Sequence, residues 1–129
     1  MRELEYPFNG EYLLKKKKSI KRTLLQDGSV RLRKKIAVLG GSTTDDIVKL
    51  LELFLLNYGI EPEFYESGYN RYYEDGVFGN EKLTDFSPDL VYIHTTSRNV
   101  PELMFPQPED SREEVERKLE EAYSHFRQV

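Results

Sequence analysis

Residues 36–46 read Ile-Ala-Val-Leu-Gly-Gly-Ser-Thr-Thr-Asp-Asp, and this stretch decides the fold of the chain. Four apolar residues followed by two glycines are typical of a buried parallel strand and a tight turn, where glycine permits positive φ or close backbone approach. Apolar residues then recur at helical spacing from Ile47 to Leu55. The stretch therefore predicts a strand, a turn and a helix. Ser42 would stand at the carboxyl end of the strand, the edge where open α/β sheets bind ligands.

The hydroxyl residues of this turn, Ser42, Thr43 and Thr44, also suit the start of a helix. Ser42 with Asp45, or Thr43 with Asp46, has the spacing of a capping box with Asp in place of Glu. Helix capping and a role in a binding site are both open. A nucleotide phosphate is not expected, because the third glycine of a dinucleotide site and the lysine of a P-loop are missing.

Two further strands are expected at residues 62–66 and 89–94, since each run is bounded by turn or breaker residues. The β-α-β order and the right-handed crossover rule predict parallel strands in the order second, first, third. Residues 67–88, rich in Gly and Tyr, predict a loop with one or two short helical turns. Polar residues 95–99 would face the Gly41-Ser42 turn across the switch point of the sheet. The expected fold class is therefore α/β, a three-layer, flavodoxin-like parallel sheet.

Charge is divided unevenly along the chain. Residues 1–35 hold 11 lysines and arginines against 4 acids, and residues 36–129 hold 8 against 19. Residues 10–26 predict an amphipathic basic helix with Leu13, Ile20 and Leu24 in one stripe, which we expect to dock on the acidic remainder of the chain. Nucleic acid, anionic lipid or an acidic partner protein are the alternatives for its lysines. We divide the chain into a basic helical arm, residues 1–33, and an α/β domain, residues 34–129.

A C-terminal helix is predicted from Ser111, which has capping-box spacing to Glu114. One face of this helix is apolar and consists of Val115, Leu119, Ala122, Tyr123 and Phe126. We expect this face to cover the sheet and the helix to lead to a fourth strand. On that expectation the chain is an incomplete piece of a larger domain.

Composition narrows the possible functions. Without cysteine, the chain has no disulfide, thiolate metal site or cysteine nucleophile, and we expect a cytoplasmic location. No apolar run approaches the ~18–20 residues of a membrane span, and the basic helix lacks the interleaved aromatic residues of a single-strand binder. We therefore expect neither a membrane nor nucleic acid as a partner.

The two histidines are far apart in the sequence, so no metal site is expected. His94 follows the third strand and is a candidate base at the ligand-binding edge, although a hydrogen-bonded structural role is commoner for such a residue. His125 is expected on a distant helix.

Five stretches, taken in order, resemble a known family. They are Tyr-Pro-Phe, the Lys-rich helix, Ile-Ala-Val-Leu-Gly-Gly-Ser-Thr-Thr, Leu-Leu-Asn-Tyr-Gly-Ile-Glu-Pro-Glu-Phe-Tyr-Glu-Ser and Phe-Ser-Pro-Asp-Leu-Val-Tyr-Ile-His-Thr. They resemble the N-terminal, SGNH-hydrolase-like domain of FkbH-like proteins, which belong to HAD-superfamily phosphatase subfamily IIIC. The resemblance implies an SGNH-like parallel sheet and a downstream HAD-like domain as the partner within the same protein. Mg would belong to that downstream domain, and no cofactor is expected in this chain.

The same resemblance implies a function in biosynthesis, because members load a glyceryl unit from a phosphorylated three-carbon acid onto an acyl carrier protein. Ser42 matches the nucleophile of SGNH hydrolases, and Gly68 and Asn99 match their oxyanion donors. Substrate contacts are expected from the same sheet edge, at Gly41, Thr43, Tyr69, Tyr72 and Thr95. The chain lacks the terminal Asp-x-x-His of these enzymes. Because a serine needs an adjacent base to attack at neutral pH, we expect the chain alone to be inactive.

Three functions follow as hypotheses. The chain is an SGNH-like module that handles an acyl group on an acyl carrier protein, with Ser42 attacking or hydrogen-bonding that group. Alternatively, it is a non-catalytic docking domain that positions the HAD-like domain and turns its basic helix toward an acidic carrier. The third hypothesis is a flavodoxin-like binder of a small ligand.

Overall fold

The computed structural model describes residues 1–129 and contains one sheet of three parallel strands. The central strand β1 (Leu32–Gly40) pairs on one side with β2 (Ile60–Glu66) and on the other with β3 (Leu90–His94). In this register Ile36 lies opposite Phe64 of β2 and Leu90 of β3. The order β2-β1-β3 confirms the predicted α/β fold class and the predicted strand order.

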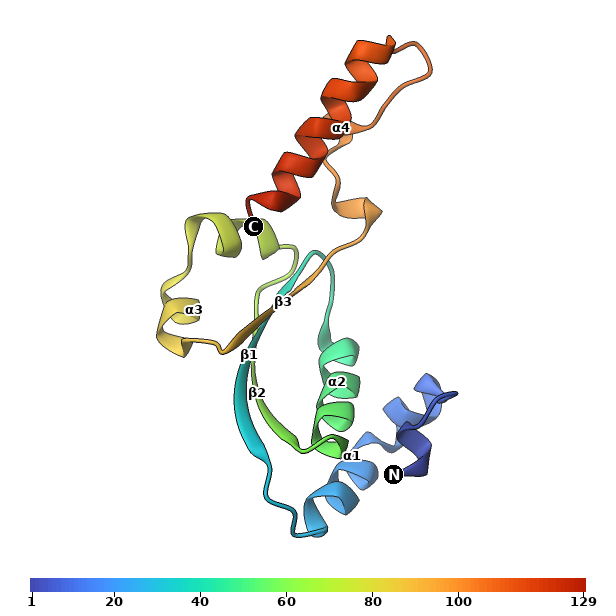
Figure 1. The fold of residues 1–129 in the computed structure, drawn as a ribbon, viewed down its shortest axis with the longest axis vertical. Coiled ribbons are helices and arrows are strands. Elements are labelled where there is room, and N and C mark those ends of the chain that lie inside the picture. The colour runs from blue at the N-terminus through green and yellow to red at the C-terminus, as the bar shows by residue number, and fades with distance from the viewer.

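Helical segments lie on both faces of the sheet and give the fold its three layers (Figure 1). Helix α2 (Asp45–Asn57) covers one face, where Val48 packs against Ile36 and Val38 of β1. The short helix α3 (Glu81–Phe86) lies on the other face, and the ring of Phe86 is 5.8 Å from that of Tyr65 on β2. The π-helical turn η2 (Glu74–Phe78) precedes α3, as expected of a loop with short helical turns.

Helix α1 (Gly10–Gln26) packs on the side of α2 that faces away from the sheet (Figure 1). Its three predicted stripe residues, Leu13, Ile20 and Leu24, are buried in one cluster with Leu53 and Leu56 of α2. The N-terminal turn η1 (Arg2–Leu4) adds Leu4 to the same cluster. The basic helix therefore docks on its own chain, as its spacing predicted.

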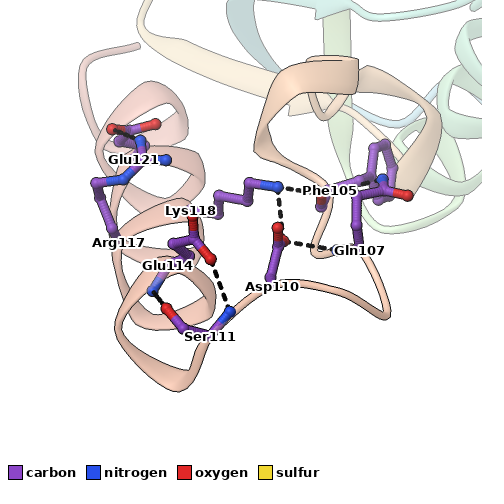
Figure 2. Close-up of polar contacts among 8 residues, drawn as sticks. All are labelled: Phe105, Gln107, Asp110, Ser111, Glu114, Arg117, Lys118 and Glu121. Atoms are coloured by element: carbon purple, nitrogen blue, oxygen red, sulfur yellow. Dashed lines mark hydrogen bonds and ion pairs between the residues drawn. The ribbon is translucent and has the colours of Figure 1, made fainter.

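The chain between β3 and the last helix contains two 3₁₀ turns, η3 (Ser97–Asn99) and η4 (Glu102–Met104). Helix α4 (Arg112–Arg127) then begins with the predicted capping box, in which Ser111 and Glu114 each bond the other's backbone N–H. Figure 2 shows how the Lys118 ammonium of this helix reaches back to the Asp110 carboxylate, at 2.6 Å, and to the Phe105 carbonyl. These contacts fix the residue at which α4 starts and the direction of the helix relative to the linker.

The expectation that α4 covers the sheet is wrong. Figure 1 shows α4 projecting from the carboxyl edge of the sheet, and the helix has no buried residue. The reason lies at its last turn, where Phe126 stacks on Tyr72 and His125 stacks on Tyr73. The loop after β2 thus holds the end of α4 at the sheet edge and keeps the helix away from the sheet face. No helix of the structure combines the length and the apolarity that crossing a bilayer requires.

Candidate functional site

The turn after β1 is held to both neighbouring strands by hydrogen bonds. The Gly41 N–H donates to the His94 carbonyl at the end of β3, at 2.8 Å. The Gly40 N–H donates to the hydroxyl of Ser67, the residue that follows β2, at 2.9 Å. The three strand ends therefore meet at one edge, which is the predicted switch point of the sheet.

Gly41 is required by close packing. A Cβ atom at this position would lie 2.3–2.4 Å from the side-chain amide atoms of Asn99, a separation that real atoms do not tolerate. Of the two reasons considered for glycine in this turn, close approach is the one that applies at Gly41. The polar cluster after β3 does face the Gly41-Ser42 turn, as the strand order predicted.

Ser42 is half-buried, and neither its hydroxyl nor its N–H is hydrogen-bonded within the chain. The capping interpretation of Ser42 and Thr43 is wrong, because the residue that precedes α2 is Thr44 and no side-chain cap is formed. The buried Thr44 hydroxyl instead donates to Glu66 Oε1 at 3.1 Å, across to the end of β2. Ser42 thus keeps a free hydroxyl at the carboxyl edge of the sheet.

Asn99 joins the loops that follow all three strands. Its side-chain oxygen accepts the Thr96 N–H at 2.8 Å and completes the capping box of η3. Its amide nitrogen donates to the Gly41 carbonyl at 2.8 Å and to Asn70 Oδ1 at 3.3 Å. Both amide protons have acceptors, so donation to an oxyanion would require one of these bonds to open.

Gly68 follows β2 at the same edge, and its N–H has no acceptor within the chain. A Cβ at Gly68 would meet only the flexible side chain of Arg71, at 2.8 Å. The unbonded backbone N–H groups of Ser42 and Gly68 therefore lie on the loops that follow the neighbouring strands β1 and β2. Two such donors are what stabilisation of an oxyanion requires.

The four remaining predicted contact residues differ in exposure. Thr43 and Tyr69 are exposed, and Thr95 is half-buried without a side-chain hydrogen bond. Tyr72 is buried, and its hydroxyl lies 3.3 Å from the Asn99 carbonyl and 2.8 Å from His125 Nε2. Burial raises the pKa of the Tyr72 phenol above its ordinary value.

The two histidines occupy different parts of this edge. His94 Nδ1 lies 3.2 Å from the Tyr92 hydroxyl on the same strand, and its carbonyl accepts the Gly41 N–H. The expectation that His125 is distant is wrong, because the end of α4 brings it to Tyr72 and thus within two contacts of Asn99. Nothing in the sequence pattern of α4 indicates this, since His125 lies beside its apolar stripe like any boundary residue.

A hollow of about 280 Å³ adjoins this cluster, lined among others by Asn70, Tyr72, Arg98, Asn99 and His125. The Arg98 guanidinium is exposed and forms no ion pair. No group of three or more His, Asp or Glu side chains is arranged to hold a metal ion. Glu74 also lines the hollow and forms no ion pair, so the hollow holds one unpaired cation and one unpaired carboxylate. Asn99 connects it to the Gly41 turn.

Asp75 is a further polar residue that sequence reasoning missed. Its carboxylate is buried on η2, with one oxygen 3.2 Å from Asn80 Nδ2 and 3.5 Å from Arg71 Nε, while the other oxygen has no partner. It lies in a loop segment without periodicity, so no pattern marked it as buried.

Comparison of the chain with protein families, curated proteins and solved structures finds no match.

Proposed function

We propose that this chain is an SGNH-hydrolase-like module that handles an acyl group, with Ser42 as the residue that attacks or hydrogen-bonds that group. The observation that carries the proposal is the free Ser42 hydroxyl after β1, together with unbonded N–H groups at Ser42 and at Gly68 on the loop that follows the neighbouring strand β2. An acyl carbonyl between these loops would find a hydroxyl and two donors for its developing oxyanion. The resemblance to FkbH-like proteins supports the same assignment and suggests an acyl carrier protein as the carrier of the group.

The same geometry argues against hydrolysis by the chain alone. Neither histidine is hydrogen-bonded to Ser42, because His94 contacts Tyr92 and His125 contacts Tyr72. A serine without an adjacent base is a weak nucleophile at neutral pH. We therefore propose that the base comes from elsewhere, such as the HAD-like domain that the resemblance implies, or that Ser42 only hydrogen-bonds the acyl group.

The test compares variants of the chain, alone and joined to such a HAD-like domain, in ester hydrolysis and in loading of a carrier protein. We expect Ser42→Ala to abolish loading by the longer protein and Ser29→Ala, which removes an exposed hydroxyl in the turn before β1, to leave it unchanged. The chain alone should show no Ser42-dependent turnover of an activated ester. Loading that is insensitive to Ser42→Ala would reject the proposal.

A second function, a non-catalytic docking domain for an acidic carrier, is favoured by the outer face of α1. Its stripe is buried, yet Lys15, Lys16 and Lys18 are exposed and form no ion pair. Reversing these three charges to Glu should weaken carrier binding and reduce its dependence on salt. The matched control is Lys82→Glu on α3, which changes an equally exposed and unpaired lysine away from α1. Equal loss in both variants would contradict docking at α1.

A further inference from the structure

An apolar groove runs beside α2 on the face of the sheet. It measures about 420 Å³ and is lined only by apolar residues, which are Ile36, Ile47, Leu51, Leu55, Leu90, Val91 and Tyr92. Parallel sheets are normally covered on both faces. Here α2 packs over β1 and β2, where Leu55 and Val48 meet Ile36 and Phe64, and leaves β3 uncovered. The apolar residues of β3 are 40–57% exposed as a result.

The chain also contains a helix face without a partner, the stripe of α4. Phe126, at one end of the stripe, stacks on Tyr72, but Leu119 is 56% exposed and Tyr123 is 60% exposed. Val115 and Ala122 lie on the same face and are only partly covered. Figure 1 shows why, since the helix stands off the body of the molecule from its last turn outward.

These two surfaces cannot meet within one molecule as it stands. The last turn of α4 is held at the carboxyl edge of the sheet by the contacts of His125 and Gln128 with Tyr72 and Tyr73. The groove, in contrast, runs along the face of the sheet beside α2. The stripe can enter a groove without breaking these contacts only if the groove belongs to another molecule.

We propose that two copies of this chain pair, each laying the stripe of its α4 in the groove of the other. A two-fold axis near the carboxyl edges of the two sheets makes the contacts reciprocal, so the assembly closes as a dimer. Each copy then supplies the missing cover over the other's β3.

The apolar area supports a second copy as the occupant. Five half-exposed residues line the groove on β3 or form the stripe of α4, namely Leu90, Val91, Tyr92, Leu119 and Tyr123. Aromatic side chains bury on the order of 150–250 Å² each, so five side chains that are about half exposed would bury at most roughly 375–625 Å² per copy. Stable interfaces bury about 800 Å² per partner, a value that flanking polar residues would complete. The two surfaces together supply most of this area, and neither does so alone.

The absence of cysteine makes a direct test possible. Leu51→Cys places a thiol in the groove, and Leu119→Cys places one on the stripe. Mixing the two single variants with a short bismaleimide should give a cross-linked heterodimer. The pair Val30→Cys and Leu119→Cys is the matched control, because Val30 is fully exposed in the turn between α1 and β1, and it should not cross-link.

Two outcomes of this test would overturn the proposal. A chain that carries both Leu51→Cys and Leu119→Cys and links only within itself would show that α4 folds onto its own groove. No cross-link in the mixed sample, with both variants folded by circular dichroism, would mean that the groove takes neither its own helix nor that of a second copy.

Sedimentation analysis supplies a second, independent readout. The unmodified chain should form a dimer as its concentration rises through the micromolar range, and Leu119→Glu should keep it monomeric. Leu119 is exposed in the single chain, so its replacement leaves the fold of the monomer intact. Val30→Glu, the same kind of change far from both surfaces, should leave the dimer unchanged. A chain that stays monomeric at every concentration, or a dimer insensitive to Leu119→Glu, would reject the pairing and leave the proposed role of Ser42 untouched.

Discussion

Helices α1 and α4 are of nearly equal length, 17 and 16 residues, and each carries one apolar stripe among many charges. Leu13 of α1 is fully buried, whereas Leu119 of α4 is 56% exposed. The cause of this difference is outside both helices, in α2. That helix is apolar on two sides, with Leu53 and Leu56 toward α1 and Val48 toward the sheet. A stripe is buried only where a second apolar face lies within reach, and α4 has no such face beside it.

The docking of α1 therefore follows from α2, because exposing either apolar side of α2 to water would be unfavourable. Helix α4 is held by the Tyr72 cluster at its last turn, by the Asp110–Lys118 pair near its start and by the linker turn η4 beside it. The comparison predicts that substitutions in α1 act on global stability, and that substitutions in α4 act locally or on pairing.

The largest expected effect comes from Leu13→Ala. This change removes a fully buried side chain from the α1–α2 cluster and should lower the free energy of unfolding by about 2–5 kcal/mol. Leu119→Ala is the matched change on α4 and should cost under about 0.5 kcal/mol at low protein concentration. Urea unfolding measures both. If the proposed pairing holds, the cost of Leu119→Ala should grow as the protein concentration rises.

Tyr72→Phe should have the next largest effect. It removes the buried hydroxyl that contacts His125 and the Asn99 carbonyl, at a cost of about 1–2 kcal/mol. Backbone amides near the end of α4 should exchange faster in this variant, since the hydroxyl is one of their few ties to the sheet edge. Tyr69→Phe is the control, because Tyr69 is 76% exposed and bonds to nothing. Unchanged exchange in residues 122–128 would mean that stacking alone holds α4.

Most of the fold could be predicted because it rests on local patterns. The apolar run before Gly40, the spacing of Leu13, Ile20 and Leu24, and the crossover rule together give the sheet order and the docked helix. The apposition of the Gly41 turn and the cluster at Asn99 follows from the strand order alone. Each of these inferences needs only the period of a segment and the chirality of its connections.

The rest depended on contacts between distant segments, which no local pattern encodes. Thr44 does not cap α2, because its hydroxyl bonds Glu66 at the end of another strand. His125 reaches Tyr72 because the linker after β3 turns α4 back to the sheet edge. The direction taken by α4 could not be read from its stripe, since periodicity gives the apolar face of a helix and not the surface that meets it.

Acid should loosen the start of α4 before it affects the body of α1. Hydrogen bonds from Lys118 and from the Gln107 N–H hold the pKa of Asp110 below its ordinary value of 3.8. Because the pKa of Asp110 is lower in the folded chain than in the unfolded chain, its carboxylate stabilises the fold at any pH above the unfolded-state pKa. This contribution is lost as the pH falls through the folded-state pKa. Protection of amides 111–116 should thus persist down to about pH 4 and decline below it.

Low pH should affect α1 only at its C-terminal end. The Ser29 N–H lowers the pKa of Asp27 in the same way, but Asp27 stands after a helix whose stripe is buried. Only the last turn of α1 should therefore fray. Asp110→Asn provides the control for α4. In this variant the amides of residues 111–116 should be as weakly protected from exchange at neutral pH as those of the unmodified chain are in acid. Wild-type protection in that variant would assign the start of α4 to the Ser111–Glu114 capping box alone.

The smallest expected effect is that of Lys21→Met, which tests whether charge contributes to the docking of α1. The Lys21 ammonium lies 2.6 Å from the Glu52 carboxylate of α2, but the two side chains are 43% and 26% exposed. Pairs this open to water contribute little, and Met keeps the length of the side chain and its helix propensity. The free energy of unfolding should fall by no more than about 0.5 kcal/mol, and added salt should shrink the difference further. A loss comparable to that of Leu13→Ala would mean that the basic helix is held by its charges, and the contrast with α4 would then rest on electrostatics instead of on the two apolar sides of α2.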